Sequence, residues 1–267
     1  MKRWLKRALR WDERSDYEKS VALYRLHYRV ARAASPAGLG LRRLMRWAGT
    51  DKDRPDGHSY GPVYAEALRP YRWRAIRLLE IGIGGTDDEA GGRSLLAWLA
   101  YFPRAHVVAC DLQDRSALAG GRLVIRQLNQ GDPGDLGRLA ADGPFDVIID
   151  DGSHLSAHQL LTFRALFDGL AEGGLYVIED VQTSYWHREV GGVAWDGAAP
   201  QSEAFGATCV GWFLELAKHL NHAEFLDPAD PALLAYARQI RRITFEHNLI
   251  LIQKGHNDAR SNTVGRP

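Results

Sequence analysis

The chain has 267 residues, of which 45% are apolar and 25% are charged, and its formal net charge is +1. This composition is typical of a globular protein, and a net charge near zero gives no overall argument for binding nucleic acid. The two cysteines, Cys110 and Cys209, form no disulfide framework. No apolar run reaches the ~18 residues that a transmembrane helix needs. We therefore expect a cytoplasmic protein with buried thiols and no transmembrane segment.

Positive charge is concentrated at the N-terminus. Residues 1–50 contain thirteen lysines and arginines against four acidic residues, whereas the remaining 217 residues contain 21 against 29. Residues 17–34 lack proline and glycine, and their apolar side chains recur at helical spacing. We predict a basic helical extension over residues 1–50 that packs on the acidic domain 51–267 or on a partner subunit of a homo-oligomer. A weak contact with a membrane surface or binding of an acidic ligand is the alternative.

The rest of the chain alternates between predicted strands and helices. Short apolar runs predict five strands, over residues 77–81, 106–111, 123–128, 145–150 and 174–180. Helices are predicted near residues 94–100, 157–170 and 205–220, and a terminal hairpin near 240–246 and 249–253. Continuous apolar strands separated by helices indicate a parallel sheet that is buried on both faces. We therefore predict an α/β fold with a doubly wound, mostly parallel seven-stranded sheet of the Rossmann-like class I methyltransferase type, which ends in an antiparallel hairpin.

Ligands of such sheets bind beyond the carboxyl ends of the strands. The first strand ends in a glycine-rich run, 80–85, whose glycines allow close approach of a ligand and which lacks the lysine of a phosphate-binding loop. Asp111 ends the second strand and can accept hydrogen bonds from both ribose hydroxyls of an adenosine group. Polar residues follow the third strand. These features predict S-adenosylmethionine (AdoMet) or another adenosine cofactor, bound by Glu80, Gly82, Gly84, Gly85, Ser94, Asp111, Gln130, Asp132 and Asp150.

Carboxylates gather at the ends of the fourth and fifth strands. Residues 150–154 have the sequence Asp-Asp-Gly-Ser-His, and Glu179 and Asp180 close the fifth strand. Neighbouring strands lie ~4.8 Å apart, so these acidic groups can converge on a cation. Oxygen ligands favour Mg²⁺, Ca²⁺ or Mn²⁺ over a structural zinc ion. We interpret His154 as a general base rather than a structural histidine, because it lies beside this cluster.

Several of these motifs resemble those of the metal-dependent sugar O-methyltransferases of natural-product biosynthesis. The resemblance extends from about residue 50 to residue 255, and its motifs lie at 50–52, 58–60, 79–85, 91–95, 149–154, 173–180, 183–186 and 220–225. It implies AdoMet and Mg²⁺, with Mn²⁺ as a substitute, and a small-molecule glycoside as acceptor. Residue by residue, it implies Asp151, Glu179 and Asp180 as metal ligands and His154 as the base.

The expected reaction transfers the methyl group of AdoMet to a sugar hydroxyl. A bound metal lowers the pKa of that hydroxyl, and His154 removes its proton as the oxygen attacks. The loop 191–200 is a candidate lid over the acceptor. The predicted acceptor contacts are His58, Tyr60, Tyr185, Trp186, Asn221 and His222.

Three other functions stay open on the sequence alone. The acceptor is alternatively a cell-surface glycan or glycolipid, or a catechol or another phenol. A non-catalytic binding or scaffold subunit with the same fold is the third alternative, and the presence of acid, metal and base positions argues against it. Nucleic acid is not expected as a partner, because the excess positive charge is confined to residues 1–50.

Overall fold

The computed structural model of the chain describes residues 14–34, 38–258 and 260–261. The chain divides into two compact units: Met1–Ile76 with Glu80–Leu128, and Arg77–Leu79 with Asn129–Pro267. None of the helices in the described residues is both long and apolar enough to cross a membrane. The predicted extension begins with residues 1–13, which lie outside the described residues.

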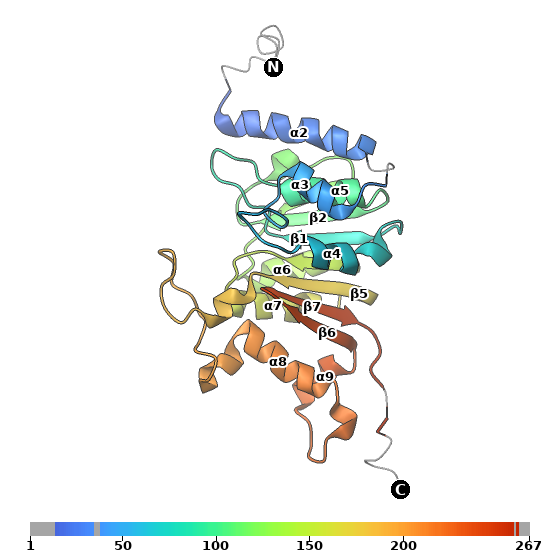
Figure 1. Cartoon of the computed structure of the whole chain (residues 1–267), viewed down its shortest axis with the longest axis vertical. Helices are drawn as coiled ribbons and strands as arrows, with labels where there is room; N and C mark the ends of the chain where they lie inside the picture. The colour runs from blue at the N-terminus through green and yellow to red at the C-terminus, as the bar shows by residue number, and fades with distance from the viewer. Residues whose placement is uncertain (1–13, 35–37, 259, 262–267) are drawn as a thin grey trace. The chain divides into compact units, whose positions relative to one another are not determined.

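The strands form one mixed sheet in the order β3-β2-β1-β4-β5-β7-β6 (Figure 1). Their bounds are β1 (Arg77–Ile81), β2 (His106–Asp111), β3 (Leu123–Gln127), β4 (Phe145–Asp150), β5 (Leu170–Glu179), β6 (Ile240–Glu246) and β7 (Leu249–Lys254). β2 pairs with β3 and β4 with β5 in parallel, whereas β7 runs antiparallel to both β5 and β6. The predicted sheet type and its terminal hairpin are thereby confirmed.

The first unit contains a helical layer around one central helix. Its helices are α2 (Asp16–Ala34), α3 (Leu41–Ala48), α4 (Gly61–Ala67) and α5 (Arg93–Tyr101), with short 3-10 helices η3 (Arg69–Tyr71) and η4 (Ser116–Leu118). α2 and α3 both pack against α5 (Figure 1). Val21, Tyr24 and Ala31 of α2 are buried, as is Trp98 of α5. The predicted N-terminal helix is confirmed, and it packs on this unit through one apolar face.

The second unit has an aromatic core. Its helices are α6 (Pro133–Ala140), α7 (Ser156–Leu166), α8 (Cys209–His219) and α9 (Pro231–Ala237), with 3-10 helices η5 (Val181–Tyr185), η6 (Glu203–Ala207) and η7 (His222–Glu224). The Phe163 ring of α7 contacts the rings of Tyr176 in β5 and Phe213 in α8 at centroid distances of 5.3 and 4.9 Å. These contacts pack α7 and α8 against the sheet and so fix the loops at its carboxyl edge.

Two predicted boundaries in this unit were wrong. The helix predicted over 157–170 ends at Leu166, and β5 begins at Leu170 rather than at residue 174. Leu170 pairs with Phe145 of β4 across an irregularity in the register. Glycines at 173 and 174 lower the local apolar signal, so the sequence pattern did not show that the strand starts before them.

Candidate active site

The turn after β1 is built from glycines in left-handed backbone conformations. Gly82, Gly84 and Gly85 have φ values of 89°, 68° and 97°. A Cβ atom on Gly85 would lie 2.5 Å from the carbonyl oxygen of Glu89, so only glycine fits there. At Gly84, in contrast, no described atom would lie within 4 Å of an added Cβ. The backbone at Gly84 is therefore open to close approach by a ligand.

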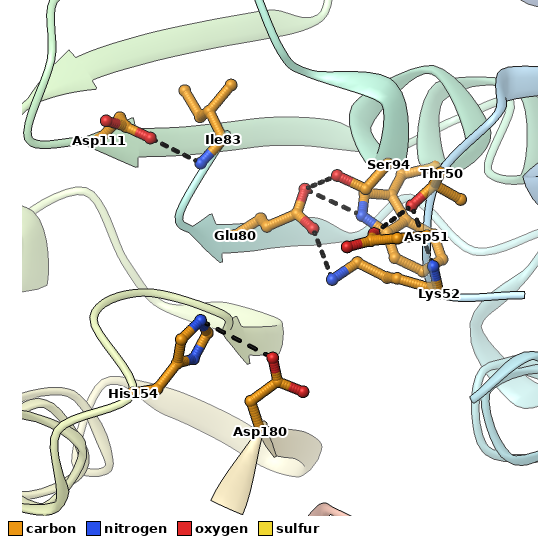
Figure 2. Close-up of polar contacts among 10 residues, drawn as sticks. Thr50, Asp51, Lys52, Glu80, Ile83, Ser94, Asp111, His154 and Asp180 are labelled. Carbon is orange, nitrogen blue, oxygen red and sulfur yellow. Dashed lines mark hydrogen bonds and ion pairs between the residues drawn. The ribbon is translucent and has the colours of Figure 1, made fainter. Parts of the chain in front are cut away.

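Asp111 connects the end of β2 to this turn. Its Oδ2 accepts a hydrogen bond from the Ile83 amide and its Oδ1 accepts one from the Gln113 amide, both at 2.9 Å; Figure 2 shows the first of these bonds. A carboxylate has about four acceptor positions, so these two bonds leave acceptor capacity for ligand hydroxyls. The side chain can therefore hold the turn and still bind a ribose.

Glu80 lies beneath the turn in a buried polar cluster. Its Oε2 accepts hydrogen bonds from Ser94 Oγ and Trp98 Nε1, both at 3.0 Å, and its Oε1 lies 3.8 Å from Lys52 Nζ (Figure 2). Lys52 is only 1% exposed. Glu80 and Ser94, predicted as cofactor contacts, thus bind each other. Sequence reasoning noted the motif 50–52 but assigned Lys52 no role.

Asp150 ends β4 and is almost fully buried. Gln130 Nε2 donates to its Oδ1 at 2.7 Å, and the Ser153 amide donates to Gln130 Oε1 at 2.8 Å. Burial raises the pKa of Asp150 to about 7, against the opposing effect of the Gln130 hydrogen bond. Gln130 therefore braces the loop after β4. Asp132 has a comparable internal contact, since it caps α6 by accepting from the Asp135 amide at 2.8 Å.

Three predicted residues come together in the second unit. Asp151, His154 and Asp180 each offer a ligand atom, and these atoms all lie within 4.8 Å of one another. Figure 2 shows that the His154 ring faces the Asp180 carboxylate, with 3.7 Å between Nε2 and Oδ2. The Nδ1 atom of His154 is buried and has no hydrogen-bond partner among the described residues. The carboxylates of Asp151 and Asp180 offer oxygen ligands that fit a hard divalent cation such as Mg²⁺ or Mn²⁺, and the His154 imidazole lies beside them.

Both His154 and Asp180 have left-handed backbone, with φ values of 59° and 54°. This conformation is unfavourable for residues other than glycine and recurs at functional sites. Thr183 helps to hold it, because its Oγ1 donates to the His154 carbonyl at 2.6 Å. The strain and the hydrogen bond together fix how the imidazole faces the carboxylate.

Glu179, the third predicted metal ligand, is the last residue of β5. It is buried, it pairs with Leu249 of β7, and its carbonyl accepts a hydrogen bond from Gln159 Nε2 at 3.0 Å. The group that the structure brings together consists of Asp151, Asp180 and the predicted base His154, and Glu179 is not one of its three members. The role of Glu179 as a ligand stays a prediction.

The predicted acceptor contacts lie in three places. Tyr185 is the last residue of η5, the 3-10 helix that follows Asp180, and Trp186 comes directly after it. Tyr185 is 43% exposed. The Trp186 ring contacts the Trp195 ring edge-to-face, with 5.4 Å between the ring centroids. Asn221 and His222 follow α8, where His222 Nδ1 donates to the His219 carbonyl at 3.1 Å. In the first unit, the ring of His58 stacks on that of Tyr60 at 4.5 Å, and Tyr60 is buried. Tyr185 and Trp186 are thus the predicted acceptor contacts that follow the metal-ligand candidate Asp180 most closely along the chain.

Known proteins resemble this chain over most of its length. No protein-family model matches the chain. The chain is 40% identical over 223 residues to the 8-demethyl-8-alpha-L-rhamnosyl tetracenomycin-C 2'-O-methyltransferase of Streptomyces olivaceus, covering 83% of the chain and 55% of the relative. It is 39% identical over 205 residues to the mycinamicin VI 2''-O-methyltransferase of Micromonospora griseorubida, covering 75% and 49%. The chain is a homologue of the sugar O-methyltransferases of antibiotic biosynthesis.

Solved structures give the same result. The MycE methyltransferase of the mycinamycin biosynthetic pathway, in complex with Mg, SAH and mycinamycin VI, superposes with a TM-score of 0.75 at 36% sequence identity. The superposition covers 86% of this chain and 57% of that one. The chain spans about half the length of the curated relatives it matches. The resemblance and fold predicted from the sequence are both confirmed.

Proposed function

We propose that the chain catalyses AdoMet- and Mg²⁺-dependent O-methylation of a sugar hydroxyl on a glycosylated natural product. The observation that carries this proposal is the group of Asp151, His154 and Asp180 at the ends of β4 and β5. It occurs in a homologue of sugar O-methyltransferases, and the MycE complex holds Mg, SAH and mycinamycin VI. A hard cation beside an imidazole favours deprotonation of a hydroxyl, because the metal lowers the pKa of the hydroxyl and the imidazole accepts its proton.

Six of the nine proposed cofactor contacts lie in the first unit. We propose that AdoMet lies against the backbone of Gly82, Gly84 and Gly85 and that Asp111 accepts hydrogen bonds from its ribose. Glu80 and Ser94 keep their predicted place in the cofactor site, although they hydrogen-bond to each other. Gln130, Asp132 and Asp150 keep their predicted place in the cofactor site, although each also makes an internal hydrogen bond.

Asp151, Glu179 and Asp180 would hold the metal, which when bound lowers the pKa of an acceptor hydroxyl. His154 then accepts the hydroxyl proton. Because its Nδ1 atom is buried, we assign the proton to Nε2, the atom that faces Asp180. Asp180 stabilises the resulting imidazolium through its negative charge. Much of the rate would come from holding the reacting groups in line.

Further parts of the proposal concern the rest of the chain. Residues 51–267 form the methyltransferase domain and residues 1–50 an extension of it. His58, Tyr60, Tyr185, Trp186, Asn221 and His222 contact the acceptor glycoside. A cytoplasmic location, a homo-oligomer and a weak membrane-surface contact through the N-terminus are kept as predictions.

The test uses the purified chain with AdoMet, Mg²⁺ and a panel of acceptors. The panel contains 8-demethyl-8-alpha-L-rhamnosyl tetracenomycin C, mycinamicin VI, their aglycones and a catechol. We expect mass spectrometry to show one added methyl group on a glycoside, none on its aglycone, and none when EDTA is present. Methylation of the catechol alone, or full activity in excess EDTA, would contradict the proposal.

A further inference from the structure

Helix α7 begins two residues after His154 and lacks a cap of its own. Its N-cap residue is Leu155, which has no side-chain acceptor, and its first turn contains no acidic residue. Ser156, the first helical residue, is buried. The first amides of a helix have no partner within the helix, so buried ones need acceptors from elsewhere.

Asp196 supplies these acceptors from a distant part of the chain. Its Oδ1 accepts from the Ser156 amide and its Oδ2 from the Ala157 amide, both at 2.8 Å. A carboxylate is well suited to this place, because the N-terminal end of a helix carries partial positive charge. Both oxygens of Asp196 are therefore committed to the helix that follows His154.

The loop that carries Asp196 is also tied to the segment after Asp180. The Gly197 amide donates to the Trp186 carbonyl at 3.2 Å, and the Ala198 amide donates to the Ser184 carbonyl at 3.0 Å. A Cβ atom on Gly197 would lie 2.2 Å from the Thr183 carbonyl oxygen, so the two segments are in direct contact. The loop thus joins the segment that carries Trp186 to the start of α7.

We propose that Asp196 is a positioning residue for His154: it clamps the loop 187–198 onto the start of α7 and thereby holds the His154 backbone in its strained conformation. The proposal rests on the function proposed for His154. The carbonyl of the strained residue His154 accepts a hydrogen bond from Thr183. On the N-terminal side of His154, the Ser153 amide donates a hydrogen bond to Gln130. Asp196 completes the restraint on the C-terminal side.

A consequence is that acceptor binding and base alignment are coupled. Trp186, a predicted acceptor contact, and Trp195 lie in the segments that the clamp joins, and their rings touch. An acceptor that orders these tryptophans therefore stabilises the clamp. A clamp that opens frees His154 to leave its left-handed conformation, which costs energy to maintain.

The test compares Asp196→Ala and Asp196→Asn with a matched control. Asp230→Ala is that control, because Asp230 caps α9 by accepting from the Ala232 and Leu233 amides and lies outside the proposed site. In hydrogen-exchange mass spectrometry, we expect residues 153–158 and 187–198 to lose protection together in Asp196→Ala, by at least tenfold. Asp196→Asn, which keeps one acceptor oxygen, should show a smaller loss, and Asp230→Ala none at either segment.

Ligand binding and turnover complete the test. Affinities for AdoMet and for Mn²⁺, used as the metal probe, should change less than about twofold, because Asp196 is proposed to contact neither. Turnover of the acceptor that the wild type methylates should fall up to ~100-fold in Asp196→Ala with partial rescue in Asp196→Asn. Loss of protection confined to 187–198, or unchanged turnover despite lost protection, would overturn the proposal. A wild type that methylates nothing would count against the proposed function alone, since hydrogen exchange still reports the clamp.

Discussion

His154 Nε2 lies 3.7 Å from Asp180 Oδ2, and both residues adopt left-handed backbone conformations. Each such conformation costs roughly 1–3 kcal/mol, so it persists only where the surrounding structure enforces it. The His154 imidazole therefore lies beside the Asp180 carboxylate, where the neighbouring strands β4 and β5 end. In this arrangement His154 can accept a proton while Asp180 stabilises the positive charge of the resulting imidazolium.

The first prediction separates a base from a metal ligand. His154→Gln should lower turnover by about 10²–10⁴-fold, because a general base acts on the proton in the transition state. AdoMet and Mn²⁺ affinities should stay close to those of the wild type. Wild-type turnover should fall on acidification, since a protonated imidazole cannot accept a proton. Steady-state kinetics, a pH–rate profile and calorimetry measure these quantities.

His106→Gln serves as the control for this substitution, because His106 is an exposed residue at the start of β2. It should leave turnover unchanged. A His154→Gln protein that binds Mn²⁺ more than tenfold more weakly would make His154 a ligand instead of the base. The group of Asp151, His154 and Asp180 would then be the metal site as the structure arranges it.

The second prediction concerns the carboxylates. EDTA should abolish turnover and added Mg²⁺ or Mn²⁺ should restore it. Asp180→Asn and Glu179→Gln should each weaken Mn²⁺ binding by more than tenfold, because each removes an anionic oxygen from the site. Calorimetric titration with Mn²⁺ measures this, and Glu215→Gln is the control, since Glu215 pairs with Lys218 on the exposed side of α8. If Glu179→Gln binds Mn²⁺ as tightly as the wild type while Asp180→Asn does not, Glu179 is a structural residue and not a metal ligand.

The sequence predicted well what depends on local pattern. Apolar runs placed Asp111 and Asp150 at strand ends, where the structure has them, and the predicted end of the fifth strand, Asp180, lies one residue beyond the observed end at Glu179. Because parallel strands share one carboxyl edge, these strand ends also predicted that Asp151, His154 and Asp180 lie close together. The structure has the three residues in one group. The sheet type followed from the same pattern.

Contacts between distant segments could not be predicted in this way. Hydrophobic periodicity says nothing about which loop meets which helix end, so the capping of Ser156 by Asp196 left no local signal. The pairing of Lys52 with Glu80 was hidden for the same reason. Gln130 was assigned to the cofactor from its place in a loop, whereas its hydrogen bonds show that it also braces that loop.

The third prediction concerns ribose recognition. Asp111→Ala should weaken AdoMet binding by roughly 1–3 kcal/mol, because it leaves ligand hydroxyls without an acceptor. It also removes the acceptor of the Ile83 amide, so the glycine turn should become less ordered. Asp111→Asn keeps one acceptor oxygen and should have a smaller effect. Asp114→Ala, at an exposed position nearby, should bind AdoMet normally by calorimetry. Equal affinities in all four proteins would remove Asp111 from the cofactor site.

The fourth prediction concerns the buried pair beneath the glycine turn. Lys52→Met removes the positive charge that faces Glu80 and leaves the carboxylate buried without it. Loss of one partner of a buried pair typically costs about 3–5 kcal/mol in the free energy of unfolding. Urea denaturation measures this cost. The double variant Lys52→Met with Glu80→Gln should recover much of the lost stability, because the uncompensated charge is gone.

The control for this pair is Lys19→Met, which breaks an exposed pair with Asp16 on α2. Solvent screens an exposed pair, so this variant should be nearly as stable as the wild type. If Lys52→Met is equally mild, the buried lysine is not needed to offset Glu80.

The fifth prediction concerns the thiols. Cys110 and Cys209 are both free and buried, as the sequence indicated. Burial raises the pKa of the Cys209 thiol well above its usual range, and the charges of Asp150 and Asp196 add to the effect. Because the thiolate is the reactive form, a water-soluble disulfide reagent should label neither thiol in the native protein at neutral pH, and both after unfolding in urea.

The same shift gives stability a pH dependence. The folded state keeps the Cys209 proton at pH values where the unfolded state has lost it, so the contribution is complete below the ordinary thiol pKa of about 8.5 and is lost as pH rises above it. The loss follows from the single proton that the unfolded state releases and the folded state keeps. Cys209→Ala should therefore lose less stability than the wild type between about pH 8 and pH 10. Urea denaturation of both proteins at the two pH values measures these losses. The smaller alanine side chain lowers the stability of Cys209→Ala equally at the two pH values, so this cost cancels when the losses are compared. Equal losses in the two proteins would show that the thiol is ionised as easily in the folded state as in the unfolded chain.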